Sequence, residues 1–211
     1  MKKLIQIGLA ILIVVMGILL VESIMKPIRF KEQKDLRYNT VVQKLKDIRT
    51  SQLAYKDVYG QFTGSFDTLI NFVKYDSLPL IYKKGEIPEE LLGKITELEA
   101  IEKGMIIRDT IHVAVIDSLF SKSYPVDSLR FIPFSNGKEF SMAQGEIITG
   151  SKLKVKVFVA KALSDYILTG LDPQSIINLN DGRTVDGDGN EYRGLMVGSM
   201  ETANNAAGNW E

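Results

Sequence analysis

The hydrophobic residues of the chain are concentrated at its N-terminus, where an apolar run extends from Leu4 to Val21 with Gln6 as its only strongly polar member. A helix of that length rises about 27 Å, close to the roughly 30 Å thickness of the hydrocarbon core of a bilayer. Backbone groups in lipid must be hydrogen-bonded within the segment, so a single span of this kind has to be helical. The run is apolar on every face, which disfavours a buried helix of a soluble protein. The pattern therefore predicts a transmembrane helix.

A second helical pattern, from about Phe30 to Tyr59, is amphipathic. Its apolar residues recur in steps of four and three, and polar residues occupy the opposite face. We expect this face to pack against the protein's own sheet; self-association along a filament is the alternative. Pro27 is expected to kink the helix or to lie in the first turn of a new one, and Gly60 to end it. The candidate interaction residues on this face are Tyr38, Val41, Leu45, Ile48, Tyr55 and Tyr59.

Downstream of the amphipathic segment, short helices and strands are predicted. Helices are expected over 66–74, with Ser65 as N-cap, and over 88–103, where a proline and two acidic residues open the segment. A helical turn is expected within 162–169, and a loop over 75–85. Strands are expected, with a hairpin turn at Asn136-Gly137, over 105–116, 129–134, 138–148, 152–160 and 192–200.

These patterns together predict an α+β fold in which a long N-terminal transmembrane and amphipathic helix packs on a small antiparallel sheet. We expect a transmembrane signal anchor (1–27), an amphipathic stalk helix (28–64) and an α+β globular head with a polar C-terminal tail (65–211). The apolar run exceeds the usual hydrophobic region of a signal peptide, and no small-residue cleavage site follows it. The anchor is therefore expected to remain uncleaved.

Basic residues on the two flanks of the apolar run give opposite indications of orientation. Lys2 and Lys3 favour a cytoplasmic N-terminus, and such a short tail need not be translocated in a signal anchor. We therefore expect a single-pass protein of the bacterial inner membrane, with the N-terminus in the cytoplasm and the head periplasmic or extracellular. The reverse orientation is favoured by the count on the other flank, which contains Lys26, Arg29, Lys31, Lys34 and Arg37.

The order of elements resembles that of type IV pilins and of the pseudopilins of type II secretion. The resemblance lies in the apolar core 11–19, in Pro27 and in the segment 45–73, where an Ile, an Ala-Tyr pair, and a Gly with an aromatic residue follow one another. It implies a structural or assembly component of a cell-envelope complex or filament. The chain departs from the family pattern at the processing site, because Gly8 is followed by Leu9, and no acidic residue lies within the apolar run.

A second resemblance, to short envelope proteins of Bacteroidota, lies in Tyr59-Gly60-Gln61-Phe62 and in Gly208-Asn209-Trp210. The resemblances imply partners in the membrane itself, in other envelope proteins, or in further copies bound through the N-terminal helix. The alternative function is a monomeric membrane-tethered module whose head binds a partner in the periplasm or outside the cell.

Composition narrows the function classes further. The 26 basic and 26 acidic residues balance, which argues against nucleic acid as a partner. The absence of cysteine rules out disulfides, thiolate metal sites and a cysteine nucleophile. The sequence contains no P-loop, no paired metal histidines and no Gly-x-Ser-x-Gly, and its only histidine, His112, lies in a predicted strand. We therefore expect neither an enzyme nor a bound cofactor.

The polar segment that precedes the last predicted strand contains the one candidate metal site of the sequence. Residues 180–191 gather oxygen-bearing side chains between glycines, and hard cations such as calcium bind such ligands. The spacing fits an EF-hand loop poorly, and Asp-Gly steps are ordinary turn chemistry, so a turn is the favoured interpretation and calcium the alternative. Some pseudopilins hold calcium in a C-terminal loop, and the resemblance implies the same option here. The candidate ligands are Asp181, Asp186, Asp188 and Asn190.

Overall fold

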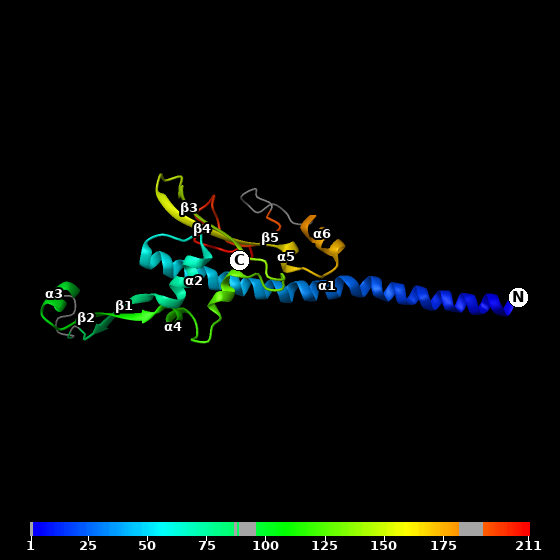
Figure 1. Ribbon diagram of the computed structural model, residues 1–211, viewed down its shortest axis with the longest axis horizontal. Coiled ribbons are helices and arrows are strands. Elements are labelled where there is room, and N and C mark those ends of the chain that lie inside the picture. The colour runs from blue at the N-terminus through cyan, green and yellow to red at the C-terminus, as the bar shows by residue number, and fades with distance from the viewer. Residues whose placement is uncertain (1, 87, 89–95, 182–191) are drawn as a thin grey trace.

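A single long helix organises the molecule. The computed structural model describes residues 2–86, 88, 96–181 and 192–211. Helix α1 (Lys2–Tyr59) runs for 58 residues, and it projects from the head at its N-terminal half while the head packs around its C-terminal half (Figure 1). Pro27 lies inside this helix, so the two sequence patterns form one continuous element. Gly60, with φ of 70°, ends α1, and its N–H donates to the carbonyl of Lys56 at 2.7 Å.

The described part of the head contains two antiparallel sheets. Strands β3 (Ser141–Ile148), β4 (Lys154–Leu163) and β5 (Gly194–Gly198) form a three-stranded sheet in that order, which lies along one side of α1 (Figure 1). Strands β1 (Ser77–Lys84) and β2 (Ile107–Ala114) form a separate two-stranded sheet. We call this pair of strands the arm, because it extends away from the head at the end opposite the N-terminus (Figure 1). The α+β class and the antiparallel pairing agree with the prediction.

Short helices connect the strands. Helix α2 (Phe66–Tyr75) forms as predicted, because the Ser65 hydroxyl accepts a hydrogen bond from the Thr68 N–H and an apolar face packs inward. The predicted helix over 88–103 lies partly outside the described residues, and its described part is α3 (Glu97–Glu102), which a capping box of Thr96 and Glu99 begins. The other helices among the described residues are α4 (Val115–Leu119), the 3₁₀ helix η2 (Val126–Arg130), α5 (Ser164–Ile167) and α6 (Pro173–Asp181).

The hydrophobic core lies between α1 and the head. Three fully buried residues of α1, Val41, Leu45 and Ile48, belong to one cluster with residues of α2, η2 and the three-stranded sheet, among them Leu69 and Phe158. Burial of each such side chain contributes about 1.5–3 kcal/mol relative to exposure in water. Half of α1 is therefore an internal element of the head.

The predicted loop over 75–85 is wrong, because this segment forms β1. Leu78, Leu80 and Tyr82 alternate along it, and β2 supplies the antiparallel partner, with Leu80 opposite Ile111. Pro79 is compatible with this strand because its pair with His112 is a non-hydrogen-bonded pair of the ladder, so its nitrogen faces the open edge of the sheet.

The predicted strand over 129–134 is also wrong. Its first residues belong to η2, and only an isolated bridge between Phe131 and Glu139 joins the segments on either side of the turn. Asn136 and Gly137 do form the predicted turn, with φ of 55° and 84°. Pro133 lacks a donor, so a regular ladder does not extend through this segment.

Candidate functional site

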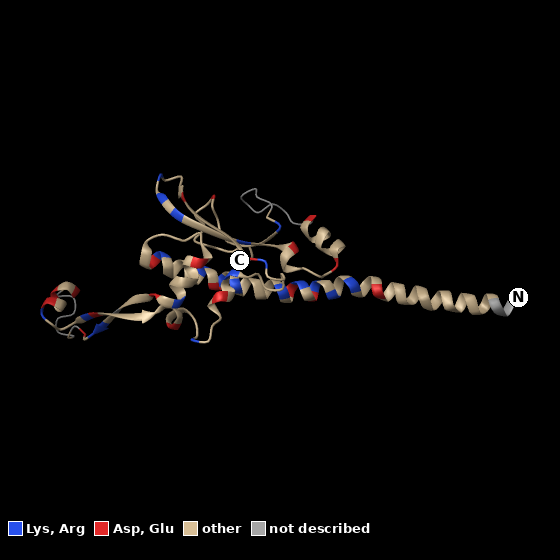
Figure 2. Ribbon diagram, viewed as in Figure 1, with Lys and Arg blue, Asp and Glu red and all other residues tan. Residues whose placement is uncertain are grey.

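The N-terminal half of α1 is an apolar surface that no described part of the head covers. Every large apolar side chain that the structure describes between Ile5 and Val21 is at least 45% exposed. This half is long and apolar enough to cross a membrane. Charged residues begin immediately after it (Figure 2). The first residue that packs on the core is Phe30, about 13 Å beyond Val21 at 1.5 Å per residue. The head therefore begins clear of the apolar half.

The amphipathic face of α1, by contrast, is occupied by the head. Val41, Leu45 and Ile48 are fully buried, and Tyr55 is buried against the edge of the Phe72 ring. Tyr38 is half-buried, and its hydroxyl lies 2.7 Å from that of Ser164. Only Tyr59, at the end of the helix, is largely exposed. Packing against the protein's own head, the favoured of the two interpretations, is what the structure contains, so these side chains already have their contacts.

A buried amide holds the end of α1 to the turn that follows it. The Gln52 side chain is fully buried. Its Nε2 donates to the carbonyl of Thr63 at 2.6 Å, and its Oε1 accepts from the Thr63 N–H at 3.1 Å. Both backbone polar groups of the buried residue Thr63 are thereby satisfied by one side chain, which fixes where the chain turns back after α1.

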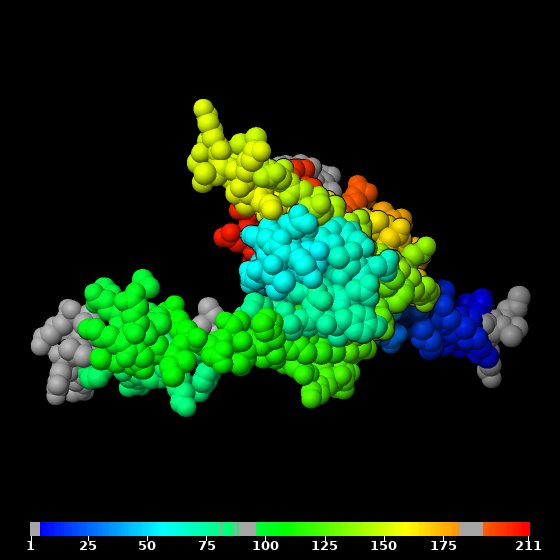
Figure 3. All heavy atoms as spheres, turned by 60° about the vertical axis from the view of Figure 1, so that its left-hand side comes forward, coloured from blue at the N-terminus to red at the C-terminus, as the bar shows by residue number. Residues whose placement is uncertain are grey.

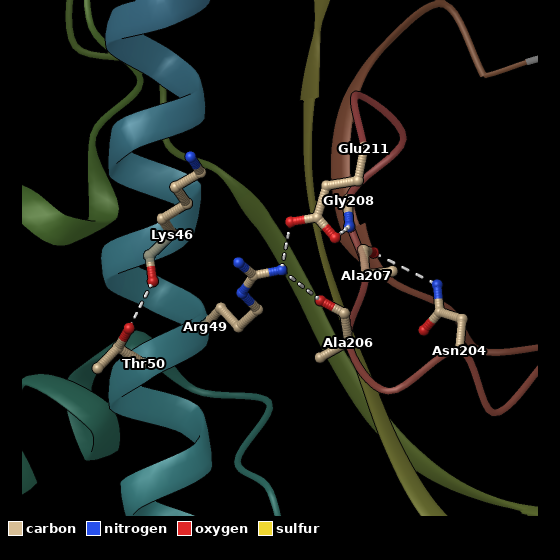
Figure 4. A network of polar contacts seen from close by, with 8 residues as sticks. All are labelled: Lys46, Arg49, Thr50, Asn204, Ala206, Ala207, Gly208 and Glu211. Atoms are coloured by element: carbon tan, nitrogen blue, oxygen red, sulfur yellow. Dashed lines mark hydrogen bonds and ion pairs between the residues drawn. The ribbon is translucent and has the colours of Figure 1, made fainter.

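A second polar contact ties the tail to α1. Arg49 donates from Nη1 to the Glu211 carboxylate at 2.7 Å and to the carbonyl of Ala206 at 3.3 Å (Figure 4). The other oxygen of Glu211 accepts from the Gly208 N–H at 3.4 Å. The hydrogen bond from Arg49 lowers the pKa of Glu211 below its ordinary value. The only tryptophan, Trp210, is half-buried against the core in the same segment, so the tail is docked.

A polar network beside η2 contains Lys44 and Ser128 at hydrogen-bond distance, which is the separation expected of a catalytic base and its nucleophile. Lys44 donates to the Ser128 hydroxyl at 2.7 Å, and burial lowers its pKa while nearby Asp47 opposes that shift. Ser128 directs its own proton to the carbonyl of Pro125 at 2.6 Å. Burial, aided by a 2.6 Å hydrogen bond to Asp47, raises the pKa of Tyr124. Because Lys44 donates to Ser128 and the Ser128 hydroxyl donates to the carbonyl of Pro125, the pair is not arranged as a base that accepts the proton of a nucleophile. The network instead holds η2 against α1.

The candidate cation ligands are not assembled in the described part of the chain. Asp181 is the exposed last residue of α6, and Asp186, Asp188 and Asn190 lie outside the described residues. Among the residues that the structure describes, no group of three or more His, Asp or Glu side chains could hold a metal ion. His112 is exposed on the arm, opposite Pro79.

A half-open pocket lies where α1, β4 and the C-terminal residues meet. Its volume is about 150 Å³, and Leu53, Phe62, Phe158 and Ala206 are among its lining residues. Small-molecule sites usually measure about 300–1,000 Å³, so this cavity is too small for a cofactor-sized ligand.

The arm is the surface that sequence reasoning missed. Figure 3 shows it, with α3, standing clear of the body of the head. At its base, the Tyr59 hydroxyl donates to Asp76 at 2.6 Å, and the Val115 N–H donates to the carbonyl of Asp76 at 3.0 Å. At its far end, Glu97 pairs with Lys83 at 2.7 Å and Arg108 at 3.0 Å, and these contacts lower the pKa of Glu97.

Comparisons with family models, curated proteins and solved structures find no match to this chain. Two features of the geometry therefore carry the argument about function. One is the exposed apolar half of α1, and the other is the arm at the opposite end of the molecule.

Proposed function

We propose that the protein is a single-pass, pilin-like structural or assembly component of a cell-envelope complex or filament. It is inserted in a bacterial inner membrane, with its N-terminus in the cytoplasm and its head periplasmic or extracellular. The observation that carries this proposal is the division of one continuous helix into an exposed apolar half and a half built into the head. An apolar helix in a bilayer is open both to lipid and to neighbouring helices.

The burial of the amphipathic face restricts where subunits meet. Because Val41, Leu45 and Ile48 are inside the head, contacts between copies or with other envelope proteins fall on the apolar half of α1 or on the outer surface of the head. This arrangement supports assembly in the plane of the membrane through the apolar half.

Crosslinking in native membranes tests the assembly role. The chain contains no cysteine, so single substitutions such as Ile11→Cys, Met16→Cys and Leu19→Cys are the only reactive thiols. We expect adducts whose yield follows the helical period of 3.6 residues along the apolar half. Asn39→Cys, on the exposed polar side of the head-bearing half, is the control. Uniformly low yields at every apolar position would refute assembly through this helix.

Labelling with a membrane-impermeant maleimide tests the orientation. Leu153→Cys lies at an exposed position between β3 and β4 and should react once the outer membrane alone is permeabilised. Lys2→Cys should react only after the inner membrane is disrupted. The opposite order of labelling would place the head in the cytoplasm, as the count of basic residues on the head side favours.

The second candidate function is a monomeric tethered module that binds a partner protein outside the membrane. The observation that favours it is the arm, which exposes apolar side chains at the end farthest from the anchor. A head truncated before Lys31 would retain such binding, whereas assembly through the apolar half of α1 would be lost. Binding measured with and without the anchor therefore separates the two functions.

A further inference from the structure

We propose that the arm is a dimerisation element, whose apolar face packs against the same face of a second copy of this chain. In this dimer both copies are anchored in the same membrane, and the strands of the two arms run in the same direction. The inference rests on the membrane anchoring proposed above and goes beyond it by identifying the contact surface and its occupant.

The two faces of the arm differ sharply in character. Side chains alternate between faces along each strand, so the register assigns every residue of the arm to one face. One face carries most of the large apolar residues, and the four that lie farthest from the base are 43–58% exposed. The apolar face consists of Leu78, Leu80 and Tyr82 from β1 and Ile107, Ile111 and Val113 from β2, with Lys84 and Asp109 as its only charges.

The apolar face continues the core outward. Leu78, at the base of the arm, packs against the core cluster, and Val113 opposite it is half-buried. Farther out, Leu80 and Ile111 remain open to solvent. A two-stranded sheet is marginally stable in water by itself and gains stability when its apolar face is covered. The arm is therefore one half of a sheet-on-sheet packing.

The membrane anchor restricts how two arms can meet. Each arm points away from the N-terminal end of α1 (Figure 1). Two copies anchored in one membrane therefore extend their arms in the same direction, away from that membrane. A two-fold axis along the membrane normal keeps both anchors in that membrane and lets the apolar faces pack with nearly aligned strands. If the two arms instead paired edge to edge about a two-fold axis along the membrane normal, they would form one sheet. The apolar faces of the two copies would then point to opposite sides of that sheet, and both would stay uncovered. Face-to-face packing is the arrangement that covers both.

This symmetry also matches residues across the interface. The rotation places β1 of one copy over β2 of the other, so Leu80 faces Ile111 of the second copy. Lys84 and Asp109 have opposite charges and take part in no ion pair between described residues. The same rotation aligns the strand that carries Lys84 in one copy with the strand that carries Asp109 in the other. The two side chains are then offset by two residues along the strand direction. Both the apolar residues and the charges of the face are thus self-complementary.

The size of the face explains why the anchor matters. Its four outer apolar side chains expose roughly 400 Å² per copy, about the largest patch of an ordinary monomer. Two copies would bury roughly 800 Å², below the about 1,200 Å² of the smallest stable interfaces in solution. Confinement of both copies to one membrane raises their effective concentration and offsets this deficit. The dimer is therefore expected in membranes and not for heads diluted in solution.

The test uses full-length protein in native membranes, with two differently tagged copies expressed together. One copy carries Leu80→Cys and the other Ile111→Cys, and mild oxidation traps the facing pair as a tagged heterodimer. Two control pairs combine Leu80→Cys with Ile107→Cys, about 14 Å along the same face, or with Thr110→Cys on the polar face. We expect at least fivefold more heterodimer from the facing pair than from either control. Equal yields from the three pairs would overturn the proposal.

A second measurement covers the case in which a cysteine variant disturbs the arm. Ile111→Asp in both copies should reduce energy transfer between labels placed on the two arms, whereas Thr110→Asp should leave it unchanged. Equal transfer in both variants, or adducts formed only with a different protein, would contradict a homodimer. If the Leu80→Cys and Ile111→Cys pair gives no excess of heterodimer while crosslinks along the apolar half of α1 persist, only the proposal of an arm dimer is refuted. Loss of the α1 crosslinks themselves refutes the assembly role instead.

Discussion

Gln52 offers the sharpest test of how the head is held on α1. Its amide satisfies both the N–H and the carbonyl of Thr63 inside the protein. Gln52→Met keeps the approximate volume and removes both hydrogen bonds. Each buried backbone group left without a partner costs about 1–3 kcal/mol, so the two groups of Thr63 together predict a loss of about 2–6 kcal/mol in the free energy of unfolding. That is a large fraction of the about 5–15 kcal/mol typical of a domain.

Gln52→Glu adds a dependence on pH with a defined sign. The neutral acid can still donate to the Thr63 carbonyl, but the carboxylate cannot, and burial further disfavours its charge. The folded pKa of this Glu should therefore lie above its unfolded value of about 4.3. A raised folded pKa means that stability is fully present below the unfolded pKa and is lost as pH rises through the folded pKa. The variant should approach the wild type near pH 4 and fall about 2–3 kcal/mol below it at pH 7.

Denaturation of the full-length protein in detergent micelles, followed by the fluorescence of Trp210, measures both effects. Trp210 is the only tryptophan of the chain and packs against the core, so its emission reports on the folded head. Gln61→Glu makes the same chemical change at an exposed position beyond the end of α1 and serves as the control. If Gln52→Glu and Gln61→Glu showed the same midpoint at pH 7, the bidentate contact would not stabilise the head.

Three further predictions use the same assay. Leu45→Asp places an unpaired carboxylate in the core and should cost several kcal/mol, and an unchanged unfolding curve would show that this face is not buried in solution. Glu211→Gln removes the negative charge that pairs with Arg49 and should loosen the C-terminal segment 204–211 at pH 7. Because the folded pKa of Glu211 is lowered, the stabilisation by its carboxylate is present above the unfolded pKa and is lost as pH falls through the folded pKa. The difference in stability between the variant and the wild type should therefore vanish in acid. Asp186→Ala with Asp188→Ala should leave the melting temperature unchanged, as should a chelator, if residues 180–191 form a turn. A rise of the melting temperature with calcium would support the cation site instead.

The sequence predicts best those elements whose signals are local. The steps of four and three through Val41, Leu45 and Ile48 describe one helical face, and that face is buried. Ser65 caps α2 as expected, and the alternation along β4 marks the central strand of the larger sheet. Each signal is contained within about two helical turns or one strand, so no knowledge of distant partners is needed.

The missed elements depend on partners far away in the chain or on weak signals. Strand β1 pairs with β2 across an intervening helix, and Pro79 obscures its alternation. Helix α6 does carry a start signal: the Asp172 carboxylate accepts from the Ser175 N–H at 2.9 Å, and Pro173 follows it at the first helical position. The arm as a projecting unit could not be predicted, because projection depends on what the head leaves uncovered.

The positions of the two exposed apolar surfaces constrain the kind of assembly that the chain can build. The end of the apolar half and the base of the arm are joined by a continuous helix from Val21 to Tyr59, which rises about 57 Å. A contact through the arm is two-fold symmetric and closes at a pair, because the same face serves both copies. If the apolar halves of α1 contact the same neighbour, the assembly ends as a dimer. If they contact a different neighbour, pairs are linked into a row that does not close. Crosslinking through the facing pair of Leu80 and Ile111, together with Ile11, therefore separates the two cases, since a dimer gives one band and a row gives a ladder.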